Sequence, residues 1–160
     1  MKTLVVFYSY EGNTRLAAGI VAEAAGGADM LELRPVRDMK SKGFMKYVWG
    51  GRAAVMGVTP VLQDFDADFD QYDLIFIGTP VWAFTYTPAL KTFFKGKYLK
   101  GKKIALFCCH EGVLGRTIAN MKKALKGNSI AGEFAIFAPA FAKDQSKLKK
   151  LSDWAVSFIK

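Results

Sequence analysis

Short runs of apolar residues alternate with helical patterns along the sequence, and this alternation constrains the fold more than any other feature. The apolar runs that predict strands are Leu4–Tyr8, Met30–Leu33, Leu74–Ile77, Ile104–Phe107 and Phe134–Phe137. The first, third and fourth runs are almost continuously hydrophobic, as is typical of parallel strands covered on both faces. Strands that alternate with helices in this way predict an α/β protein, a three-layer sandwich around a five-stranded parallel sheet.

Four helical patterns complete the alternation. The first begins after Asn13-Thr14, the second at Thr87-Pro88 and the last at Asp144, while the third ends at Gly127. Apolar residues three and four positions apart are expected to face the core. They are Leu16, Ile20 and Ala24 in the first helix, Leu90, Phe93 and Phe94 in the second, Ile118, Met121 and Leu125 in the third, and Leu148, Leu151, Ala155 and Phe158 in the last.

The length of the chain predicts one domain over residues 1–160, and its composition predicts a folded one. The chain is 51% hydrophobic and 23% charged, which excludes a disordered protein. No apolar run reaches the roughly 18 residues that a membrane helix needs, and no signal peptide is visible. The two cysteines, Cys108 and Cys109, are adjacent and are expected to be free thiols in a reducing compartment. We therefore expect a cytoplasmic protein without a membrane partner.

The positive charge lies in the second half of the chain. Residues 1–90 hold 8 basic and 10 acidic side chains, whereas residues 91–160 hold 15 basic and 4 acidic ones. Solvated helix faces would account for this excess, and so would a surface that attracts an acidic partner. The lysines do not alternate with aromatic residues as they do in proteins that bind single-stranded nucleic acid, so nucleic acid is disfavoured as a partner.

The loop after the first strand has the residues of an anion site. It reads Ser9-Tyr10-Glu11-Gly12-Asn13-Thr14 and leads directly into a helix. Hydroxyls flank a glycine, and the N–H groups and positive end of the following helix face one point, which suits a phosphate monoester. The loop is neither a Walker loop nor the dinucleotide fingerprint. An ordinary turn capped by Asn13 or Thr14 is the alternative.

The loop after the third strand, residues 78–88, is rich in aromatic residues. Trp82, Phe84 and Tyr86 lie between Pro80 and Pro88, at the edge of the sheet where ligands bind in α/β proteins. A planar aromatic ligand would stack on such side chains. A hydrophobic plug over the end of the sheet is the alternative interpretation.

The loop after the fourth strand, residues 108–117, contains both cysteines and the single histidine, His110. These residues are contiguous and have no second ligand cluster, so we predict no metal site. The aspartates at 64, 66, 68 and 70 likewise lack the glycine and glutamate of a calcium loop. Cys109 is one residue too far from Arg116 for a cysteine phosphatase, and adjacent Cys-His is awkward for catalysis. We expect this loop to present backbone groups to the edge of a ligand.

Together the three loops resemble those of the flavodoxin family, over the whole chain. Residues 9–14 match the family's phosphate loop, [ST]-x-[ST]-G-x-T, except at Glu11, which replaces a hydroxyl. Thr79-Pro80-Val81-Trp82 is similar to the loop that places a tryptophan beside the flavin. The stretch 109–112 falls where the family contacts the pyrimidine edge of the ring, although the second stacking tyrosine is missing. Phe84, Trp49 or His110 could cover that face.

The resemblance implies bound FMN, the strand order 2-1-3-4-5 and a short-chain form without an insertion in the fifth strand. The residues that it assigns to the cofactor are Ser9, Tyr10, Glu11, Gly12, Asn13, Thr14, Thr79, Pro80, Val81, Trp82, Ala83, Phe84, Cys109, His110, Glu111 and Gly112. No catalytic side chain is assigned, because the flavin carries the chemistry. Electron carriers of this family are typically acidic, whereas this chain is basic, and positive potential near the flavin would raise its reduction potential.

The leading functional hypothesis is therefore an FMN-binding electron-transfer protein with a redox partner protein, expected to be acidic. The alternative is an FMN-dependent NAD(P)H:quinone-type reductase of the same fold. In that case residues 39–58, which include Phe44, Tyr47, Trp49 and Met56, would form a substrate wall. A flavin-free interaction module is a third hypothesis. A phospho-receiver is disfavoured because Ser9 and Thr79 stand where it needs aspartates.

Overall fold

The computed structural model describes residues 1–38, 51–52, 56–142 and 144–159. The strands are β1 (Thr3–Phe7), β2 (Asp29–Glu32), β3 (Leu74–Pro80), β4 (Lys103–His110) and β5 (Ser129–Phe137). The helices are α1 (Asn13–Ala24), the 3-10 helix η1 (Phe69–Gln71), α3 (Pro88–Lys95), α4 (Thr117–Ala124), α5 (Pro139–Ala142) and α6 (Gln145–Val156). Most of the expected substrate wall at 39–58, including Phe44, Tyr47 and Trp49, lies outside the described residues.

The five strands form one parallel sheet in the order β2-β1-β3-β4-β5. The predicted fold class and strand order are therefore confirmed. The fifth strand runs without an inserted loop, interrupted only by a register shift where Ile104 pairs with Ile130 and Ala105 pairs with Gly132. Strand order reverses between β1 and β3, so the crevice beyond their carboxyl ends is where a ligand is expected.

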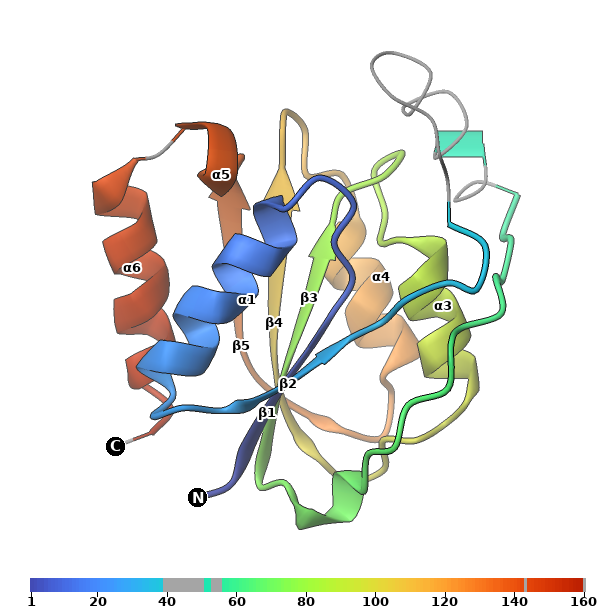
Figure 1. Ribbon diagram of the computed structural model, residues 1–160, viewed down its shortest axis with the longest axis horizontal. Coiled ribbons are helices and arrows are strands. Elements are labelled where there is room, and N and C mark those ends of the chain that lie inside the picture. The colour runs from blue at the N-terminus through green and yellow to red at the C-terminus, as the bar shows by residue number, and fades with distance from the viewer. Residues whose placement is uncertain (39–50, 53–55, 143, 160) are drawn as a thin grey trace.

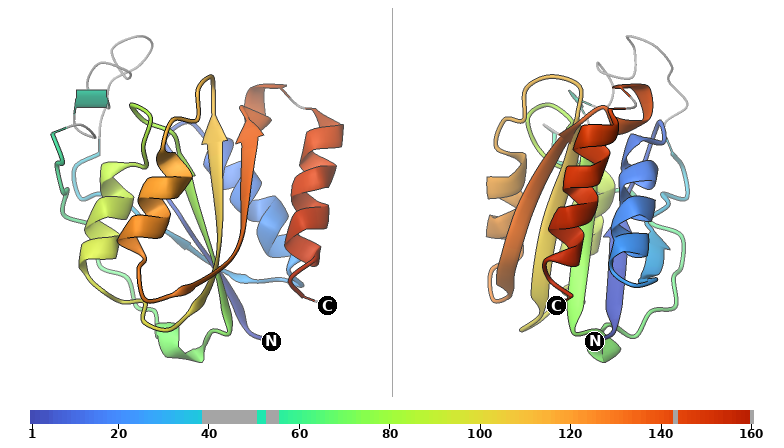
Figure 2. Two further views of the ribbon diagram at one scale, coloured as in Figure 1. Left: turned by 180° about the vertical axis from the view of Figure 1, so that it is seen from behind. Right: turned by 90° about the vertical axis from the view of Figure 1, so that its left-hand side faces the viewer.

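Helices cover both faces of the sheet. Helices α3 and α4 lie on one face, and α1, α5 and α6 lie on the other (Figures 1 and 2). Each face has its own hydrophobic core. Alternate strand residues such as Ile75 and Ile104 pack with Leu90 and Phe93 of α3. On the other face, Phe76 packs in the cluster that includes α1 and α6. Because side chains alternate along a strand, one continuous apolar run supplies both cores.

The prediction for the first helix is wrong at Leu16, while Ile20 and Ala24 are half-buried and pack against the core. Leu16 is 40% exposed, whereas Ala17, Ala18 and Val21 are fully buried. Small residues let α1 pack closely on the sheet, and the larger Leu16 is left at the rim. For the second and last helices the predicted faces hold, since Leu90, Phe93, Leu151 and Ala155 are buried. Asp144 caps α6 by accepting a hydrogen bond from the N–H of Lys147.

Two strands extend beyond their predicted ends. Strand β3 continues through Pro80, and β4 continues through Cys108, Cys109 and His110, which the sequence placed in a loop. The reason is pairing on both sides, because Cys108 pairs with Thr79 of β3 and with Ala135 of β5. Among the described residues, no helix is long and apolar enough to cross a membrane.

Candidate functional site

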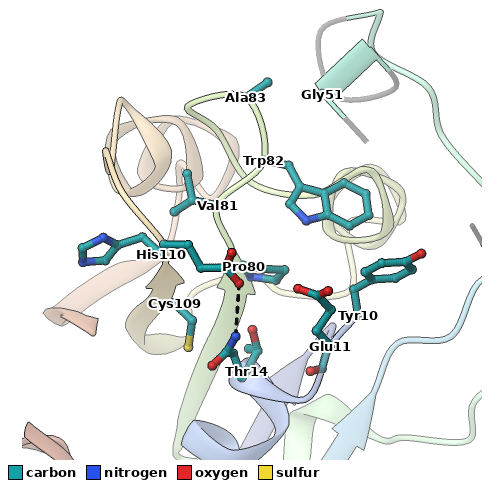
Figure 3. Close-up of a pocket in the computed structure, with 13 residues that line it drawn as sticks. Tyr10, Glu11, Thr14, Gly51, Pro80, Val81, Trp82, Ala83, Cys109 and His110 are labelled. Atoms are coloured by element: carbon teal, nitrogen blue, oxygen red, sulfur yellow. Dashed lines mark hydrogen bonds between the residues drawn. The ribbon is translucent and has the colours of Figure 1, made fainter. Parts of the chain in front are cut away.

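A pocket opens at the carboxyl ends of β1, β3 and β4, where the strand order reverses. It holds about 640 Å³ of space, including the part open to solvent. Figure 3 shows how side chains from the three predicted loops converge on it. The lining residues are Ser9, Tyr10, Glu11, Asn13, Thr14, Gly51, Pro80, Val81, Trp82, Ala83, Cys109, His110 and Glu111.

The loop after β1 turns into α1 at Gly12. Gly12 is the N-cap and has a φ of 95°, in the left-handed region that favours glycine. No side chain caps α1, so the alternative of a turn capped by Asn13 or Thr14 does not hold. The hydroxyl oxygen of Ser9 instead accepts a hydrogen bond from the N–H of Arg15, at 3.1 Å. The first N–H groups of α1 have no partner within the helix and point toward the pocket end of the sheet.

The hydroxyl of Thr14 is the one buried side-chain polar atom of the described residues that has no hydrogen-bond partner. Thr14 is 1% exposed and lines the pocket. The thiol of Cys109 interacts with this hydroxyl, but sulfur is a weak hydrogen-bonding group. Burying a hydroxyl without a good hydrogen bond costs free energy, and at this position the hydroxyl is available to a ligand in the pocket.

Asn13 holds the loop at 9–14 against two other segments. Its side-chain oxygen accepts a hydrogen bond from the N–H of Ala140 in α5, at 2.8 Å. Its side-chain nitrogen donates to the carboxylate of Glu111, at 3.4 Å, as the dashed line in Figure 3 marks. Asn13 therefore fixes the start of α1 relative to the loop after β4 on the opposite side of the pocket.

Trp82 is the aromatic residue of the β3–α3 loop that lines the pocket. Its ring makes edge contacts with Tyr8, at 5.6 Å between centroids, and with Tyr10, at 5.8 Å. Tyr8 in turn donates a hydrogen bond from its hydroxyl to Asp38, at 2.9 Å. Burial, together with the carboxylate of Asp38, raises the pKa of Tyr8 well above its usual value, so this phenol stays protonated. Trp82 is thus fixed by a rigid aromatic cluster.

The two cysteines and His110 belong to strand β4. Both thiols are free and buried, and burial raises the pKa of each to about 12. They remain protonated at neutral pH, which argues against a nucleophilic role. His110 has its Nδ1 2.7 Å from the backbone oxygen of Gly112, and its ring makes an edge contact with Phe137. The structure therefore directs this imidazole toward its own loop and β5.

Four residues that the sequence assigned to the cofactor lie outside the pocket lining: Gly12, Thr79, Phe84 and Gly112. Gly12 and Gly112 shape their loops. The Thr79 hydroxyl is fully buried and accepts a hydrogen bond from the N–H of Thr87, which ties the end of β3 to the start of α3. Phe84 is 61% exposed. Conversely, Gly51, which belongs to the segment 39–58 expected to form a substrate wall, lines the pocket although it was not assigned to the cofactor.

The charged residues that line the pocket are acidic. Among the described lining residues, Glu11 and Glu111 carry carboxylates, and none is a lysine or an arginine. The positive charge of the second half of the chain is therefore not concentrated at the pocket, and the expected increase in reduction potential has no support from the pocket's own side chains. No group of three or more potential ligands in the described parts of the chain could hold a metal ion.

The fold and the site define a class of protein: a doubly wound α/β protein with a polar loop at a helix N-terminus and a tryptophan at the switch point of its sheet. Comparison with known families gives the narrower assignment. The family model described as Flavodoxin matches residues 2–150. The chain belongs to the flavodoxin family, as the resemblance predicted. Membership of this family supports FMN as the cofactor.

Solved structures share this fold at low sequence identity. A flavoprotein from Lactobacillus acidophilus, in complex with FMN, is 22% identical, with a TM-score of 0.72 over 91% of this chain and 99% of that one. A protein from Bacteroides eggerthii is 23% identical, with a TM-score of 0.77 over 96% of this chain and 94% of that one. Oxidised Flavodoxin 2 from Bacillus cereus is 18% identical, with a TM-score of 0.64 over 99% of this chain and 97% of that one. No curated protein matches the chain.

Proposed function

We propose that this protein binds FMN at the pocket and transfers electrons through it. When bound, FMN would supply the redox chemistry, because the flavin can accept and release electrons. The protein's own residues bind and orient the cofactor. Family membership and the complex of the Lactobacillus acidophilus flavoprotein with FMN support this assignment.

The loop at 9–14 would hold the phosphate. Its donors are the hydroxyls of Ser9 and Thr14 and the N–H groups at the start of α1. These donors are neutral, and the helix dipole adds positive potential at the same point. Glu11 stands where the family pattern has a hydroxyl, so one hydrogen bond to the phosphate is absent from this set.

The ring would lie between the loop that carries Trp82 and the loop at 109–112. Trp82 is fixed by Tyr8 and Tyr10, so it offers a preformed aromatic surface. Backbone groups of residues 109–112 would meet the polar edge of the ring. No side chain of this set is assigned a proton-transfer step.

The observation that carries the proposal is the buried, unpartnered hydroxyl of Thr14 at the start of α1. The test is the visible absorbance spectrum of the purified protein after FMN is added and free flavin is removed by gel filtration. Retention of about one flavin per chain, with quenched flavin fluorescence, is the expected result. A colourless protein that retains no FMN would refute the cofactor, and with it both redox functions.

A second candidate function is the NAD(P)H:quinone-type reductase. The observation that favours it is the apolar surface on the two loops that bracket the pocket, where Phe84 and Val113 are 61% and 70% exposed. Such a surface suits an apolar acceptor such as a quinone. Steady-state oxidation of NADH or NADPH with a quinone separates the two functions, because a pure carrier turns over only with a partner reductase.

The proposed partner of the carrier is an acidic redox protein in the cytoplasm. The excess of lysine in residues 91–160 supports an acidic partner through long-range attraction. The unbridged thiols of Cys108 and Cys109 suit a reducing compartment. The rate of electron exchange with an acidic ferredoxin-like protein should fall as ionic strength rises. A rate independent of salt would refute electrostatic attraction.

A further inference from the structure

The turn that follows Trp82 has an unusual backbone for its sequence. Trp82 and Thr85 exchange two backbone hydrogen bonds, of 2.9 and 3.0 Å, around Ala83 and Phe84. Both central residues are in the left-handed region, with φ values of 46° and 64°. A two-residue turn with this geometry normally contains Asn-Gly, because side chains are strained there. The surrounding structure must therefore hold this turn in place.

The segment at 115–120 supplies that hold. The N–H of Arg116 donates a hydrogen bond to the backbone oxygen of Phe84, at 2.9 Å. The Gly115 backbone lies against Phe84 so closely that a Cβ on Gly115 would be 2.3 Å from the Phe84 Cβ and 2.6 Å from its Cα. From α4, the side-chain nitrogen of Asn120 donates to the Thr85 hydroxyl, at 2.9 Å.

These contacts join the two loops that bracket the pocket. Trp82 and Ala83 line one wall, and His110 and Glu111, on the chain leading to Gly115, line another. Gly115 itself has a φ of 58°, so glycine is required there both for conformation and for the close approach. The position of Trp82 therefore depends on residues that do not touch the pocket.

We propose that Gly115 and Asn120 are positioning residues for the flavin ring, acting through the Ala83–Phe84 turn to set the place of Trp82. This inference depends on the proposed function, because it assumes that the ring lies beside Trp82. It predicts a loss of affinity on the ring side of the cofactor and none on the phosphate side, which the loop at 9–14 provides.

The test compares Gly115→Ala with the control Gly19→Ala. Gly19 lies in α1 and outside the pocket lining, a Cβ there would meet nothing within 4 Å, and no positive φ constrains that position. Dissociation constants for FMN and for riboflavin are measured by flavin fluorescence, together with the unfolding of each apoprotein. We expect G115A to weaken both flavins by the same factor, about tenfold, and to increase the fluorescence of bound flavin, while G19A matches wild type in flavin affinity and fluorescence.

Asn120→Ala and Thr85→Val form a second test if G115A does not fold. Each removes one partner of the same hydrogen bond, so the double variant should bind flavin no more weakly than either single variant. A purely structural role would lower the stability of the apoprotein but leave flavin affinity and fluorescence unchanged.

The outcomes are distinguishable. If wild type retains no FMN, the proposed function fails and this inference fails with it. If wild type binds FMN but G115A and N120A both match wild type in affinity and fluorescence, this inference alone is overturned. A loss of FMN affinity without a loss of riboflavin affinity would also overturn it, because the effect would then lie at the phosphate.

Discussion

Replacing Thr14 by valine should stabilise the apoprotein and weaken FMN binding. The two side chains have the same shape, and the hydroxyl that is removed is 1% exposed and unpartnered. An unpaired buried hydroxyl costs about 1–3 kcal/mol, so we expect Thr14→Val to raise the free energy of unfolding by up to about 1 kcal/mol once the lower helix propensity of valine is included. A hydrogen bond to a charged phosphate contributes about 1.5–3 kcal/mol, so FMN affinity should fall roughly 10- to 150-fold.

The assays are urea unfolding of the apoprotein and fluorescence titration with FMN and riboflavin. Riboflavin has no phosphate, so its affinity should be the same for wild type and Thr14→Val. Thr14→Ser keeps the hydroxyl and serves as the matched control. A valine variant that is less stable than wild type yet binds FMN equally well would refute the reasoning, because the hydroxyl would then serve the fold and not the ligand.

Three further predictions concern the fold and the electrostatics. The two arginine partners of Glu32 outweigh its burial and lower the pKa of its carboxyl, so its contribution to stability is present above the unfolded pKa of about 4.3 and is lost as pH falls through the folded pKa. Glu32→Gln should therefore lower the free energy of unfolding by about 0.5–1 kcal/mol at pH 7 and leave it unchanged near pH 2. An equal loss of stability at both pH values would contradict this. Gly78→Ala would place a Cβ 2.1 Å from the buried ring of Phe107 and should lower the free energy of unfolding in urea by about 1–3 kcal/mol. Gly19→Ala, whose Cβ on helix α1 would meet nothing within 4 Å, should instead stabilise the protein. Similar effects of the two variants would refute the packing argument. Glu111→Gln should raise the one-electron potential of bound FMN by roughly 20–60 mV in potentiometry, and an unchanged potential would exclude this carboxylate as an influence.

The sheet could be predicted because its central strands are buried on both faces. Leu74–Ile77 and Ile104–Phe107 are continuous apolar runs, and these residues form the fully buried middle of the observed strands. Strand ends could not be predicted from composition. Pairing with a neighbour extends β4 through His110, and this pairing depends on register between distant segments.

The inner face of α1 could not be predicted for a different reason. Periodicity identified Leu16, Ile20 and Ala24 as the inner face, but Leu16 is exposed and the other two are only half-buried. The close approach of α1 to the sheet instead selects Ala17, Ala18 and Val21, which are fully buried. Helix spacing is a property of the packed pair of elements, so the sequence of one helix does not reveal it.

The candidate site divides in the same way between local and distant determinants. The loop at 9–14 and Trp82 were identifiable as pocket residues because residue type and spacing mark a candidate anion site and a candidate aromatic wall. The orphaned hydroxyl of Thr14 and the contact between Gly115 and Phe84 were not, because they depend on atoms brought together by the fold. Residues that line the pocket can thus be identified from local sequence patterns. Residues that position them can be identified only from the close approach of two loops in the structure. Variants such as G115A therefore test a property of this chain that its motifs do not reveal.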